Sequence, residues 1–103
     1  MNLDDFIKST DEGENPPDGM SASLRAMWLA RANKWDQAHD LCQEIGGVDG
    51  AWIHAYLHRI EGDLGNAAYW YSVAGKKVPA KGLPIDREWT AIVEVMLEEC
   101  GES

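Results

Sequence analysis

The segment from Asp49 to Gly75 constrains the fold more than any other part of the chain. It contains two largely apolar stretches separated by the short sequence Glu61-Gly62-Asp63. Glycine has no Cβ atom, so Gly62 can adopt the left-handed conformation that ends a helix. The carboxylate of Asp63 can then accept a hydrogen bond from a free amide at the start of the next helix. The segment is therefore predicted to form a hairpin of two α-helices.

Apolar residues recur at helical spacing after this turn. They are Leu64, Ala67, Ala68, Tyr71 and Ala74,. We expect them to form the buried face of the second helix. The small side chains on this face, together with Ala51 and Ala55 on the first helix, favour a close approach of the two helix axes.

The spacing of Gly62, Ala67, Tyr71 and Pro79 resembles the turn glycine, alanine, large aromatic and proline of tetratricopeptide repeats,. The run from Asn66 to Gly75 is also similar to the second helix of Sel-like repeats. The resemblance implies a short right-handed stack of helical hairpins that acts as a non-catalytic protein-interaction module. The chain is also similar to a small group of bacterial proteins with the pattern WDxAH…AYLHRxEGDxxNAxYWY, a resemblance that implies no activity.

A weaker copy of the same pattern lies upstream. Asn33, Trp35, Ala38 and Cys42 stand where the second copy has Gly62, Leu64, Ala67 and Tyr71. The first helices depart from the tetratricopeptide pattern, because His54, Ala55 and His58 occupy its Leu, Gly and Tyr positions. Two hairpins are thus predicted over residues 20–79, with helices at about 20–32 and 35–45 in the first hairpin.

The complete prediction is an all-α single domain over residues 1–103. Residues 1–19 are expected to form a short helix carrying Leu3, Phe6 and Ile7 and a mobile acidic loop from Thr10 to Gly19, and to contribute little stability,. A capping helix at 84–100 is expected to cover the open flank of the stack.

The capping helix is predicted from its apolar stripe. The stripe consists of Ile85, Trp89, Ile92, Val93, Met96 and Leu97,. Glu88 and Glu94 lie between these positions and are expected to face water. Of the two cysteines, Cys42 is interpreted as a small buried apolar residue, and Cys100 as a free thiol near the C-terminus.

Charge excludes several partners. Eighteen acidic against nine basic residues give a net charge of −9. Binding to nucleic acid or to an anionic membrane surface requires clustered basic residues, so neither is expected. No apolar run is long enough for a membrane span, and the acidic N-terminus lacks a signal pattern, so a cytoplasmic location is predicted. An unknown protein or peptide is the expected partner, and the chain is expected to be a monomer or a homodimer.

Four residues are predicted to bind a peptide. In the repeat register, the first helix of each hairpin lines a concave side, and its candidates are Met27, Trp52, Tyr56 and Arg59. Aromatic and arginine side chains contribute strongly to protein interfaces. Alternatively, Trp52 and Tyr56 are core residues, and the capping helix folds back into the groove.

A group of histidines suggests a second hypothesis, in which the protein binds a metal ion rather than a peptide. His54, His58 and Glu61 have the spacing i, i+4, i+7 and share one helix face, which His39 could approach. Such a group could hold zinc or iron in a small metal-binding protein or metal-dependent enzyme. Alternatively, the histidines are hydrogen-bonded core residues. The chain has no HExxH motif, glycine-rich phosphate loop or nucleophile elbow, so neither a catalytic residue nor a cofactor is predicted.

Overall fold

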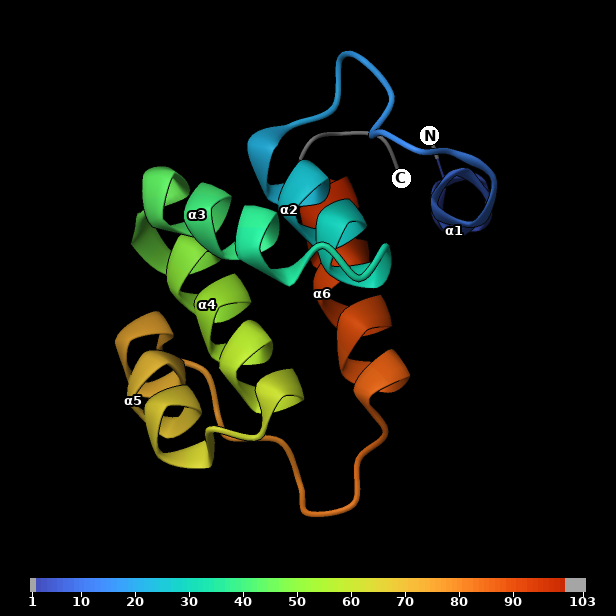
Figure 1. The fold of residues 1–103 in the computed structure, drawn as a ribbon. Coiled ribbons are helices and arrows are strands. Elements are labelled where there is room, and N and C mark those ends of the chain that lie inside the picture. The colour runs from blue at the N-terminus through green and yellow to red at the C-terminus, as the bar shows by residue number, and fades with distance from the viewer. Residues whose placement is uncertain (1, 100–103) are drawn as a thin grey trace.

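The computed structural model describes residues 2–99, which form six α-helices and no strands (Figure 1). The helices are α1 (Leu3–Glu12), α2 (Ala22–Arg31), α3 (Trp35–Ile45), α4 (Gly47–Glu61), α5 (Leu64–Ala74) and α6 (Ile85–Glu99). The all-α prediction is confirmed. None of these six helices combines the length and the apolar character needed to cross a bilayer. Cys100 lies outside the described residues.

The hairpin turn between α4 and α5 forms as its sequence predicts. Gly62 has φ 90° and lies in the left-handed region, where glycine meets no Cβ clash,. The Asp63 side chain accepts a hydrogen bond from the Asn66 backbone N–H at 3.3 Å and so caps α5,. Asn33, in the turn between α2 and α3, also has a positive φ of 63°. In both hairpins, a residue with a positive φ angle therefore lies at the predicted turn position.

Consecutive helices from α2 to α5 pack against one another, and α2 also contacts α4. α4 approaches the backbone of α3 closely at Gly50. A Cβ atom added to Gly50 would lie 2.7 Å from the backbone oxygen of Cys42, which is closer than side chains can come. Glycine at this position thus allows α4 to lie directly against the backbone of α3.

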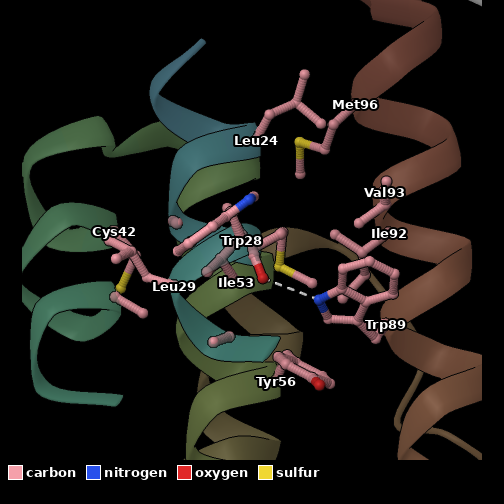
Figure 2. Packing of buried hydrophobic residues seen from close by; sticks show 14 of the residues in the cluster. Leu24, Trp28, Leu29, Cys42, Ile53, Tyr56, Trp89, Ile92, Val93 and Met96 are labelled. Atoms are coloured by element: carbon pink, nitrogen blue, oxygen red, sulfur yellow. Dashed lines mark hydrogen bonds between the residues drawn. The ribbon is translucent and has the colours of Figure 1, made fainter. Parts of the chain in front are cut away.

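The main core lies between α6 on one side and the two helices α2 and α4 on the other (Figure 2). Trp28 of α2 and Trp89 of α6 are its largest buried side chains. The Trp89 indole N–H donates a hydrogen bond to the backbone oxygen of Met27 at 2.9 Å. This bond satisfies the polar atom of the indole inside the core. Most of the predicted apolar stripe of α6 is buried as expected, with Ile85 partly buried at its edge.

The position of α6 differs from the prediction that it caps the open flank. It packs against α1, α2 and α4, while α5 lies on the other side of α4 (Figure 1). The segment between Gly75 and Ile85 connects the end of α5 to the start of α6 on the other side of α4. The apolar stripe of α6 then packs against α2 and α4. The outer face of α5 is therefore left uncovered. Leu64 is 67% exposed and Ala68 is also exposed, although both were predicted to be buried.

Glu88 was expected to face water, but it is only 5% exposed. Its carboxylate accepts a hydrogen bond from Arg59 Nη1 of α4 at 2.9 Å and another from the Tyr71 hydroxyl of α5. Arg59 Nη2 donates to the backbone oxygen of Leu83 in the segment before α6. Burial, and then the hydrogen bond to Glu88, raise the pKa of Tyr71 above its usual value,. These contacts attach α6 and its connecting segment to the second hairpin.

The N-terminal helix is also more firmly packed than its sequence indicated. α1 runs to Glu12, three residues into the expected loop. Phe6 is fully buried, and its ring centroid lies 5.7 Å from that of Trp89. The Trp28 indole N–H donates to Ser9 Oγ at 3.1 Å. Phe6 thus belongs to the main core, and this packing points to a larger contribution of residues 1–19 to stability than the sequence predicted.

We expect Phe6→Ala to lower the free energy of unfolding by about 3–5 kcal/mol, because it removes a fully buried ring and leaves a cavity against Trp89,. Urea denaturation followed by circular dichroism measures the change. Lys8→Ala, at an exposed position of the same helix, is the control and should have little effect. Equal stability of the two variants would contradict the packing of α1.

Candidate metal centre

Three histidines from two helices converge on one point. His39 lies on α3, and His54 and His58 lie one turn apart on α4. One ring nitrogen of each residue lies within 4.8 Å of those of the other two. The closest pair, His39 Nε2 and His54 Nε2, is separated by 3.0 Å and shares a hydrogen bond. His54 and His58 are buried, whereas His39 is half-buried at the edge of the group.

Two tryptophans fix the orientation of these rings. The Trp35 ring stacks on His39, with centroids 4.7 Å apart and planes inclined by 12°. Trp70 of α5 stacks on His54 at 4.0 Å and 15°. The Trp35 indole N–H donates to the backbone oxygen of Leu57 at 2.8 Å, which anchors that indole to α4. The imidazoles are therefore held between two aromatic planes from α3 and α5.

Glu61 is hydrogen-bonded to His58. Its Oε1 lies 2.5 Å from His58 Nδ1. A carboxylate at this nitrogen favours a proton on Nδ1 and leaves the lone pair on Nε2. The structure brings together three of the four sequence candidates, His39, His54 and His58, and places Glu61 beside His58. Their role as metal ligands stays a prediction. Glu61 and Asp63 also form a second close group with His58, but both carboxylates are exposed.

His54 is held in its neutral form. Burial, followed by the nearby positive charges of His39 and His58 when protonated, lowers the pKa of His54 to about 4 from its ordinary 6.5,. His54 is therefore uncharged at neutral pH. A neutral imidazole offers a nitrogen lone pair, which is the form that binds a metal ion.

Cys42 lies near the histidines but does not join them. It is buried, its thiol contacts the backbone oxygen of His39 at 3.1 Å, and burial raises its pKa to about 12. The thiolate required of a ligand or a nucleophile is thus disfavoured. A surface pocket of about 440 Å³ opens between Cys42, His54 and Trp70 and adjoins the histidine group on that side.

The predicted peptide groove is filled by α6. Met27 is fully buried and Tyr56 is 3% exposed, so neither offers a surface to a partner. Arg59 is held by its contacts to α6 and to the segment before it. Trp52 is half-buried, and the ammonium group of Lys76 lies 4.2 Å from the centre of its ring. Met27 and Tyr56 thus follow the alternative interpretation, in which they are core residues and the last helix folds back into the groove. The peptide-binding role of Trp52 and Arg59 stays a prediction.

Sequence reasoning identified all three histidines but missed the tryptophans around them. Trp35 precedes His39 by four residues, and this spacing brings two side chains together on a helix,. The contact between Trp35 and His39 could therefore have been predicted from the sequence. Contact between Trp70 and His54 depends instead on how α5 packs against α4, which no local spacing determines.

Comparisons of the chain with protein-family models, with curated proteins and with solved structures found no match. The role of the three histidines is therefore inferred from their geometry.

The stability of the metal-free protein should depend on pH through His54. The folded state takes up the proton near pH 4, whereas the unfolded chain takes it up near 6.5. The His54 contribution is therefore fully present above pH 6.5 and is lost as the pH falls towards 4. Urea denaturation in the presence of a chelator measures this dependence, and His54→Gln should remove part of it. Titration of the His54 ring by NMR near pH 6.5 would contradict the low pKa.

Proposed function

We propose that this chain is a small metal-binding protein that holds one zinc-type divalent cation at His39, His54 and His58. The observation that carries the proposal is the convergence of one nitrogen from each of three imidazoles within 4.8 Å. Imidazole nitrogen is a common ligand of zinc, copper, iron and nickel, and three histidines form a known type of zinc site.

The ligand geometry supports this assignment. Two nitrogens bound at about 2.0–2.1 Å to a tetrahedral zinc ion lie about 3.4 Å from each other. His39 Nε2 and His54 Nε2 are 3.0 Å apart, so these rings need to separate by only a few tenths of an ångström. A cation would take the place of the proton that these two nitrogens share.

The surroundings match those of a metal centre. A histidine that binds a metal usually donates its other N–H to a carboxylate or carbonyl oxygen, which orients the ring and makes the ligand more basic. His58 has this arrangement with Glu61. Three protein ligands leave one coordination position for water or another small ligand, where a bound zinc ion would supply Lewis acidity.

We expect the purified protein to bind one equivalent of Co²⁺ or Zn²⁺, measured by metal analysis and by the visible absorption of the cobalt form. His39→Ala and His54→Ala should each abolish stoichiometric binding. Glu61→Gln should weaken the affinity by about 10–100-fold, because it removes the charged partner of His58,. Glu44→Gln, at an exposed position of α3, is the matched control. Absence of cobalt binding by the folded wild-type protein would refute the proposal.

A second candidate function is protein interaction, with α2 to α5 forming a tetratricopeptide-like stack of two hairpins. The observation that favours it is the outer face of α5. Tyr69 is 61% exposed and Val73 is 50% exposed. The sequence of this helix, LGNAAYWYSVA, contains no charged residue. An uncharged face on an acidic chain is suited to contact with another apolar surface.

If α5 is an interaction surface, Tyr69→Glu should prevent capture of a partner from native cells, because it introduces a charge into the contact. The control is Ala91→Glu, which adds the same charge at an exposed position of α6. Quantitative mass spectrometry of the captured proteins measures the difference. A partner retained equally by both variants would contradict a role for this face.

A further inference from the structure

A second hollow lies beside the second hairpin. It has a volume of about 360 Å³ and is formed by the end of α4, the start of α5 and the segment that leads to α6. Leu64, Tyr71 and Val78 contribute to its walls. Ligand pockets in proteins typically begin at about 300 Å³, so the hollow is large enough for a small molecule.

The walls of this hollow carry uncovered apolar surface. Leu64 is 67% exposed and Val78 is 59% exposed, and these are among the most exposed large apolar side chains of the chain. They approach the hollow from different segments, α5 and the connection to α6. A ligand with an apolar body would remove both side chains from water at once.

The charged residues around the hollow are both basic. They are Arg59 and Lys81, and no acidic residue lines it. The charge of Arg59 is balanced by Glu88 at 2.9 Å. Lys81 is exposed and takes part in none of the ion pairs found among residues 2–99. An uncompensated ammonium group thus stands beside an apolar hollow in a chain whose net charge is −9.

We propose that this hollow binds a small aliphatic monocarboxylate. Its hydrocarbon chain packs on Leu64 and Val78, and its carboxylate pairs with the Lys81 ammonium group. A charge-assisted hydrogen bond of this kind distinguishes the carboxylate from an alcohol of the same length. The site is separate from the three histidines and does not depend on a bound metal.

The test uses octanoate as the probe, with isothermal titration calorimetry on the full chain. Octanoate should bind with a stoichiometry of one, and 1-octanol should bind about tenfold more weakly because it lacks the charge. Lys81→Glu should reduce octanoate affinity by at least about tenfold, since it replaces attraction by repulsion. Lys77→Glu makes the same change of charge at an exposed position of the same segment outside the hollow, and is the matched control.

A second pair of variants tests the apolar walls. Leu64→Gln should weaken octanoate binding, whereas Val73→Gln, an exposed position of α5 that does not line the hollow, should not. Both side chains are largely exposed, so neither change should affect folding. Equal affinities for octanoate and 1-octanol, equal effects of Lys81→Glu and Lys77→Glu, or no octanoate binding by the folded wild-type protein would each overturn the proposal.

Discussion

The buried carboxylate of Glu88 determines how the C-terminal half of the molecule is arranged. A charged group removed from water is tolerated only when it is paired and hydrogen-bonded. Glu88 meets this requirement through Arg59 of α4 and the Tyr71 hydroxyl of α5. Each partner lies on a different helix of the second hairpin, so α6 satisfies its carboxylate only when it lies along the side of α4 where both can reach. Together with the burial of Trp89, this contact selects the position of α6 beside α2 and α4.

Because α6 lies along one side of α4, the two sides of α4 have different neighbours. One side faces α6, and Ile53, Tyr56 and Leu57 are buried in the main core. The other side presents His54 and His58 to α3 and α5. The sequence alone contains this conflict, because the apolar pattern and the repeat register of α4 indicate different buried faces. Both faces are covered, which explains why a helix that is apolar on most sides, rather than on one face, lies at the centre of the fold,.

Local sequence signals predicted the fold where the physical cause is local. The turn at Gly62 and the cap at Asp63 depend on backbone conformation and on one nearby amide, so they could be inferred directly. The burial of Trp89 followed from a helical stripe. Glu88 could not be assigned in this way, because a carboxylate adjacent to a buried stripe normally faces water and its partners are 29 and 17 residues away. The same reason explains why the shared face of His54, His58 and Glu61 could be read from their spacing on one helix, whereas the approach of His39 from α3 was left open.

The electrostatic setting of the histidines bears on their proposed role. Bringing a divalent cation into a partly buried site requires loss of its hydration, which neutral imidazoles offset through coordination rather than through charge. Burial keeps His54 neutral, so no positive charge on that ring opposes the cation at neutral pH. The Glu61 carboxylate, 2.5 Å from His58 Nδ1, would supply negative charge next to a cation at the proposed site. The net charge of −9 attracts cations over longer distances,. A neutral His54 and a carboxylate next to His58 would therefore both favour a cation at the proposed site.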